Sequence, residues 1–240
     1  MWTCSVRSHT DACSYRVLPD NCIDILWQDS SALGFATGMM TASKSVTMTA
    51  QVSTIAVRFK PGRASHFFQL PLNELTDLHA DMRELWGRDR AGRINDALWT
   101  KPLSDRERMH ILEKHLIAHL TQGRITPPFG LVNHAVAAIE SSCGAVKIDA
   151  LAKNVGVTRQ HLAARFRVEV GISAKTFARI CRFRRAMAGI RHARASAERI
   201  DWAALALDSG YFDQSHLIHD FQEFAADSPE SFAIQRASSV

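Results

Sequence analysis

The chain has 240 residues, of which 46% are hydrophobic and 22% charged, with a formal net charge of +5. This composition is typical of a soluble globular protein with one large domain or two smaller ones. It argues against a membrane-spanning protein, because no apolar run approaches the roughly 20 residues that a spanning helix needs. The polar N-terminus also lacks the apolar stretch of a secretory signal. We therefore expect a cytoplasmic protein whose basic excess suits a polyanionic partner.

The first sixty residues predict β-strands separated by turns. The stretch 15–28 places a turn at Pro19-Asp20-Asn21 before an apolar run, and residues 44–59 alternate with period two and contain many β-branched residues. Pro61-Gly62 predicts the turn that ends this region. We expect its aromatic residues to lie in the core rather than in a ligand cage: Trp27, Phe35, Phe59, Phe67 and Phe68.

Helical patterns follow this β-rich region. Leucine and methionine spacings of three and four predict one helix within residues 70–87, with Asn73 as its N-cap and Gly87 as its C-cap. A second helix is predicted to begin at Ser104, which forms a capping box with Glu107.

The stretch 124–130, "RITPPFG", predicts a linker because it contains two consecutive prolines and a glycine. Every segment after it has a helical pattern. Two of these segments resemble each other, 148–177 and 202–232.

Each copy has an Ala-Leu-rich first helix, a glycine, a hydrophobic residue, and a second helix with Leu and Phe four positions apart. The glycine permits the left-handed backbone of a tight turn, and the Leu and Phe fix one face of the second helix on the core. This pattern predicts a helix-turn-helix, whose second helix reads bases in the DNA major groove. The corresponding residues are Gly156, Leu162 and Phe166 in the first copy and Gly210, Leu217 and Phe221 in the second.

The region from about residue 131 to 235 resembles the DNA-binding domain of AraC/XylS-type transcriptional regulators. The resemblance rests on "LA.NVGVTRQHL..RF...VGIS", "FARI.RFRRAM" and "GYFDQSHLI.DF..F...SPESF". It implies an α+β protein, with an N-terminal mixed effector or oligomerisation domain over 1–87, a helical connector over 88–128, and an all-α double helix-turn-helix domain over 129–240. Residues before the connector resemble a divergent regulatory region of such proteins.

The resemblance also implies which side chains face DNA. Two departures, Ala164 and His219 where the family often has arginine, prevent the target sequence from being carried over. The residues expected to read bases are Arg159, Gln160, Ala163, Asp213, Gln214, Ser215, Ile218 and His219. The residues expected to contact phosphates are Arg165, Arg167, Arg182 and Arg185, although internal salt bridges on a solvated helix face would also explain them.

Asp213 is also placed to cap its helix. His216 and His219 have a metal-ligand spacing on a helix, but without a third ligand nearby we expect capping and DNA-facing roles instead.

We therefore expect a regulator without catalytic residues, metal or cofactor. Its partners are promoter DNA and RNA polymerase, and a small-molecule effector and a second copy of the chain remain open. The rival hypothesis is a DNA-targeted enzyme or alkyl acceptor that uses an N-terminal cysteine, namely Cys4, Cys13 or Cys22.

Overall fold

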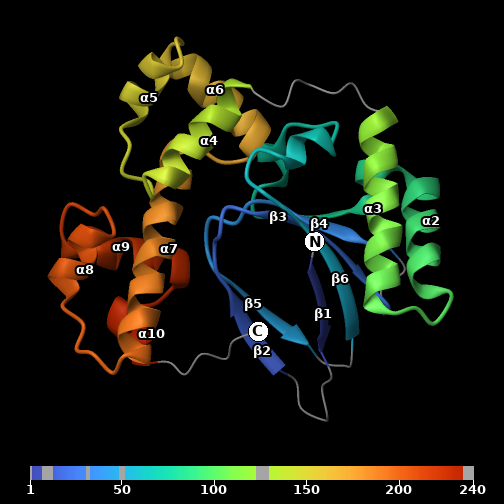
Figure 1. The fold of residues 1–240 in the computed structure, drawn as a ribbon, viewed down its shortest axis with the longest axis horizontal. Coiled ribbons are helices and arrows are strands. Elements are labelled where there is room, and N and C mark those ends of the chain that lie inside the picture. Colours follow the sequence, from blue (N-terminus) through green and yellow to red (C-terminus); the bar gives the residue numbers. More distant parts are fainter. Residues whose placement is uncertain (1, 7–12, 31–32, 49–51, 123–129, 235–240) are drawn as a thin grey trace.

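The computed structural model describes residues 2–6, 13–30, 33–48, 52–122 and 130–234, with strands in the N-terminal part and helices in the C-terminal part (Figure 1). A five-stranded antiparallel sheet has the order β1 (Trp2–Val6), β6 (Val52–Phe59), β3 (Ile23–Gln28), β4 (Phe35–Thr37) and β7 (His79–Asp81). A separate two-stranded sheet pairs β2 (Cys13–Val17) with β5 (Lys44–Met48). The predicted α+β class is confirmed.

Strand β3 shows why the sheet forms where the sequence alternates. Its residues alternate between buried and half-buried, so that Ile23, Ile25 and Trp27 face the core. The register with β6 sets Ile25 opposite Val57. The predicted core aromatics are confirmed, because Trp27, Phe59, Phe67 and Phe68 are buried and only Phe35 is half-buried.

Three helices follow the sheet, α1 (Met82–Trp86), α2 (Arg88–Trp99) and α3 (Asp105–Gln122). The capping box at the start of α3 is confirmed, because the Ser104 amide donates to Glu107 Oε2 at 2.8 Å and the Glu107 amide donates to Ser104 Oγ at 3.4 Å. Gly87 ends α1 with a φ of 81°, as predicted. Helices α2 and α3 pack together at one side of the sheet (Figure 1).

The single helix predicted within residues 70–87 is wrong. The chain there forms two 3-10 turns, η1 (Ala64–His66) and η2 (Leu72–Leu75), followed by β7 and the short α1. Asn73 lies inside η2 and is not a cap. The helical path is broken at Asp77, whose φ is 60° and whose carboxylate accepts the Thr41 amide at 2.7 Å. Tertiary hydrogen bonding therefore overrides the helical spacing of the leucines.

The C-terminal part consists of seven helices among the described residues. The predicted linker lies almost entirely in 123–129, outside those residues. The helices are α4 (Leu131–Ser141), α5 (Ile148–Asn154), α6 (Arg159–Val170), α7 (Ala174–Ala195), α8 (Trp202–Asp208), α9 (Gln214–Ala225) and α10 (Pro229–Ile234). Of the helices described, none is long and apolar enough to cross a membrane.

Candidate nucleic-acid interface

The two repeated segments form two helix-turn-helix units, α5–α6 and α8–α9, joined by the long helix α7 (Figure 1). The turn of each unit contains a glycine in the left-handed region, Gly156 at φ 74° and Gly210 at φ 84°. A side chain is strained in this conformation, which is the predicted reason for glycine at both positions. At Gly210 an added Cβ would also come within 3.3 Å of the Arg182 side chain.

Each second helix begins with a side-chain cap. Thr158 Oγ1 accepts the His161 amide at 3.1 Å in α6, and Asp213 Oδ1 accepts the His216 amide at 2.9 Å in α9. The predicted capping role of Asp213 is confirmed. The hydrogen bonds from the His216 amide and ring hold the pKa of Asp213 below its usual value. Asp213 thus has a local structural task, and its reading of a base remains a prediction.

Buried anchors fix the orientation of both second helices. Leu162, Phe166, Leu217 and Phe221 are all fully buried. The ring of Phe221 packs edge-on against Phe183 of α7 at a centroid distance of 4.9 Å. Because the anchors fill one face of each helix, the opposite face is left to solvent.

The exposed face begins with polar residues at the N-terminal end of each second helix. Arg159 Nε lies 3.3 Å from Asp149 Oδ1, but both side chains are well exposed, so this pair is weak and exchangeable. The side chain of His219 is 70% exposed. Of the residues expected to read bases, Arg159, Gln160, Ala163, Ser215 and His219 are exposed, and Asp213, Gln214 and Ile218 are half-buried.

The arginines of α7 do not form one solvated basic face. Arg182 Nη1 donates to Gly144 O at 2.7 Å, and its guanidinium lies 5.6 Å from the centre of the Tyr211 ring. It therefore joins the turn between α4 and α5 to the second helix-turn-helix unit, which favours the alternative structural role over phosphate contact. Arg184 Nη1 likewise donates to Asp20 O at 3.0 Å.

The other arginines expected at phosphates have exposed side chains. Arg185 and Arg167 lie on the surface, on α7 and α6 respectively. Arg165 forms an ion pair with Glu169 one turn further along α6, which is a weak surface interaction. These three remain available for phosphates.

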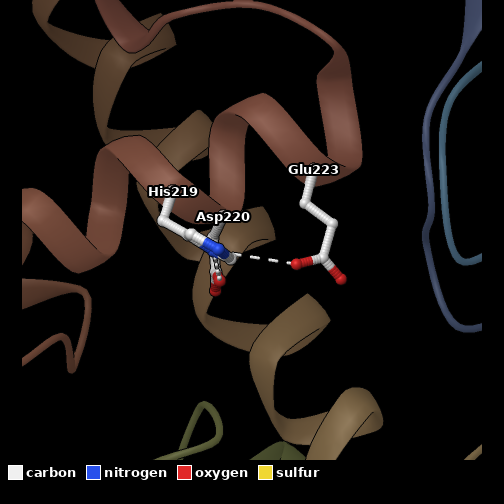
Figure 2. A group of neighbouring side chains, drawn as sticks. All are labelled: His219, Asp220 and Glu223. Carbon is white, nitrogen blue, oxygen red and sulfur yellow. Dashed lines mark ion pairs between the residues drawn. The ribbon is translucent and has the colours of Figure 1, made fainter.

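The histidine pair of α9 is not assembled into a metal site. The cluster that does form contains His219, Asp220 and Glu223, without His216 (Figure 2). Arg179 already donates to Asp220 Oδ1 at 3.0 Å and to Glu223 Oε1 at 3.0 Å. The Arg179 guanidinium is always positively charged and already neutralises the two carboxylates that a metal ion would need. The cluster is therefore a salt-bridge network.

The N-terminal part holds the C-terminal end of both second helices, a feature that no local sequence signal indicates. Thr76 Oγ1 donates to Gly171 O, directly after α6, at 2.6 Å. Arg16 Nη1 donates to Ala225 O, in the last turn of α9, at 2.7 Å. Between them, Asn21 Nδ2 donates to Phe177 O of α7 at 3.1 Å. We refer to these three hydrogen bonds as the brace.

The rival cysteine chemistry finds no support at Cys22. Burial first, and the nearby Asp20 carboxylate second, raise the pKa of this thiol to about 12. The thiol is therefore protonated at neutral pH and a poor nucleophile. The side chains of Cys4 and Cys13 lie outside the described residues.

Comparison with known proteins yields two domain families and several solved structures. Residues 1–81 match a domain of unknown function, and residues 151–235 match a helix-turn-helix domain. No curated protein matches the chain.

Three of the similar solved structures are AraT, ToxT and XylR. The C-terminal domain of AraT, a response regulator from Geobacillus stearothermophilus, is 18% identical over 48% of this chain and 92% of that chain, with a TM-score of 0.41. ToxT from Vibrio cholerae is 9% identical over 93% and 97%, with a TM-score of 0.49. The xylose-binding transcription activator XylR is 15% identical over 53% and 38%, with a TM-score of 0.35.

The matched helix-turn-helix domain begins within α5 and extends over the rest of both units of the repeat described above. The C-terminal part of the chain is therefore a helix-turn-helix domain of the AraC type behind an N-terminal domain of unknown function, and the protein is a DNA-binding transcription regulator.

Proposed function

We propose that the protein reads two successive major-groove segments of promoter DNA with the N-terminal ends of α6 and α9. The observation that carries this proposal is the matched construction of the two helices, each capped at its start, anchored by a buried Leu and Phe, and polar on its free face. The protein performs no catalysis, needs no metal or cofactor, and works in the cytoplasm by occupying promoters and contacting RNA polymerase.

Among the base-reading residues, Gln214 is the most informative to test. It follows the cap Asp213 at the start of α9, and a glutamine amide can pair bidentately with adenine. Gln214→Ala should cost roughly 1–3 kcal/mol at one base position and relax the preference there.

The matched control is Gln222→Ala, an exposed glutamine in the last turn of the same helix. Binding-site selection with both purified variants makes the comparison. If Gln214→Ala selects the parental sequence at every position, Gln214 does not read a base.

We also propose that the N-terminal part regulates DNA binding through the brace. Its three hydrogen bonds fix α6, α7 and α9 relative to one another, and therefore fix the spacing between the two groove segments that the protein reads. An effector or self-association that moved this part would change that spacing.

Thr76→Val removes the brace donor at Gly171 and keeps the side-chain shape. We expect it to reduce the discrimination between operators whose half-sites differ in spacing by one base pair. Thr47→Val, an exposed threonine of β5, is the control. Parental discrimination in Thr76→Val and Arg16→Ala together would contradict a regulatory role for the brace.

A further inference from the structure

The cleft between the start of α2 and the middle of α3 is a second basic site, apart from the helices that read DNA. It is a cavity of about 570 Å³ whose lining includes Trp86, Arg88, Arg90, Arg93 and His115. Figure 1 shows α2 and α3 on one side of the sheet, whereas α8 and α9 lie on the other side of the molecule. We propose that this cleft binds a small molecule that carries a phosphate group.

The positive charge of the cleft is not neutralised within the part of the chain that the structure describes. None of its three arginines forms an ion pair there. Asp89 is the one carboxylate among the lining residues, so three positive charges face a single negative one before His115 is counted. Arg90 lies over the Trp86 ring, 5.8 Å from its centre, but this contact leaves its positive charge unneutralised. Like charges held together without ion-pair partners attract an anion, because its binding relieves their repulsion.

The mutual repulsion contributes to lowered pKa values of groups around the cleft. The pKa of Arg90 is lowered by burial and then by Arg93, and the pKa of His115 is lowered by burial and then by both arginines. On the same side of α3, burial and Arg90 also lower the pKa of His119. A bound anion would oppose the arginine contributions and raise the pKa of both histidines.

A phosphate group suits this arrangement better than a single carboxylate does. Several guanidinium forks can share the oxygens of a dianion, each in a bidentate contact. The first turn of α2 lines the same cleft, so its free backbone amides add to the positive potential. The volume lies in the range of small-molecule sites and exceeds that of a phosphate ion, so it leaves room for an organic group beside the phosphate.

The wall of the cleft is connected to the first reading helix. Trp86 Nε1 donates to Phe67 O at 2.7 Å, and His119 Nε2 lies 3.1 Å from the same oxygen. Phe67 directly follows η1, which packs against α6. A ligand that shifts Trp86 can therefore shift α6, and this part of the inference rests on the proposed regulatory function.

Calorimetric titration of the full chain with phenyl phosphate, inorganic phosphate and benzoate tests the site without DNA. Phenyl phosphate should bind more tightly than the other two. Arg90→Gln should weaken its binding about tenfold or more, because it removes a charged donor. Asp89→Asn should strengthen binding, because it removes the opposing carboxylate. Arg106→Gln, which removes one exposed charge from α3 outside the cleft, should have no effect.

Two further measurements complete the test. The imidazole pKa of His115, followed by NMR, should rise when phenyl phosphate is added to the parent and stay constant in Arg90→Gln. Equal binding by the parent and Arg90→Gln, or tighter binding of benzoate than of phenyl phosphate, would overturn the proposal. A loss of DNA affinity in Arg90→Gln without ligand would also overturn it, because the cleft would then belong to the DNA surface. DNA binding by Arg90→Gln without ligand should equal that of the parent, so a failed anion site leaves the DNA-reading proposal intact.

Discussion

Arg182 and Arg185 lie three residues apart on α7, and their surroundings in the structure differ. Arg182 donates to Gly144 O at 2.7 Å and packs on Tyr211, whereas Arg185 is exposed. Arg182→Ala removes a charged hydrogen bond worth about 1.5–3 kcal/mol and a cation–π contact of roughly 0.5–1 kcal/mol. We therefore expect the free energy of unfolding to fall by about 2–4 kcal/mol. Arg185→Ala should change it by less than about 0.5 kcal/mol.

We expect the opposite pattern for DNA binding, which should depend on Arg185 and not on Arg182. If Arg185 neutralises one phosphate, its removal should reduce the slope of log affinity against log salt by about 0.9. Arg182→Ala should leave that slope unchanged under conditions in which the variant is folded. Urea unfolding and fluorescence anisotropy between low and moderate salt provide the two measurements.

The assignment of Arg182 is refuted by a stable Arg182→Ala protein with a reduced salt slope, because that result would show a phosphate contact. For Arg185, an unchanged slope together with a loss of stability would show that its charge acts within the fold.

Three further predictions concern stability and reactivity. Leu217→Ala should lower the free energy of unfolding by about 2–5 kcal/mol, because it leaves a cavity in the core. Leu207 is 63% exposed, so Leu207→Ala should have little effect. Urea unfolding of both variants tests whether Leu217 anchors α9. Gly92→Ala should stabilise α2 by roughly 0.5–1 kcal/mol, since the added Cβ would have no atom within 4 Å among the described residues beyond its chain neighbours and the helix backbone. A lower melting temperature would contradict this. The pKa of Cys22 is raised to about 12, so this thiol should resist iodoacetamide at pH 8 in the folded protein and react after unfolding in urea. Peptide mapping can show the difference, and rapid modification of the native protein would support the hypothesis of a reactive N-terminal cysteine.

The C-terminal part was predictable because its signals are local and occur twice. Gly210, Asp213, Leu217 and Phe221 lie within twelve residues, and each performs a task that its own residue type specifies, namely a left-handed turn, a cap or a core anchor. The sequence therefore located both reading helices.

The failures occurred where distant residues decide the local structure. The leucine spacing within residues 70–87 predicted a helix, but Asp77 bonds to Thr41 and breaks it. The sequence around Arg182 was compatible both with a phosphate contact and with a structural contact inside the domain. Only the hydrogen bond from Arg182 to Gly144 O distinguishes the two roles. The basic cleft combines α2 with α3, so its residues have no fixed spacing that a sequence pattern could reveal.

The brace holds α6 at the end opposite to its candidate base-reading residues. Helix α6 has 12 residues and is therefore about 18 Å long. Thr76 holds its C-terminal end at Gly171, whereas Gln160 and the other candidate readers lie at its N-terminal end. A tilt of about 5° at Gly171 would move Gln160 by about 1.5 Å, which is enough to break a hydrogen bond to a base. Because the held end and the reading end are separated by the whole helix, a tilt about Gly171 displaces the candidate readers at the N-terminal end more than any other part of α6.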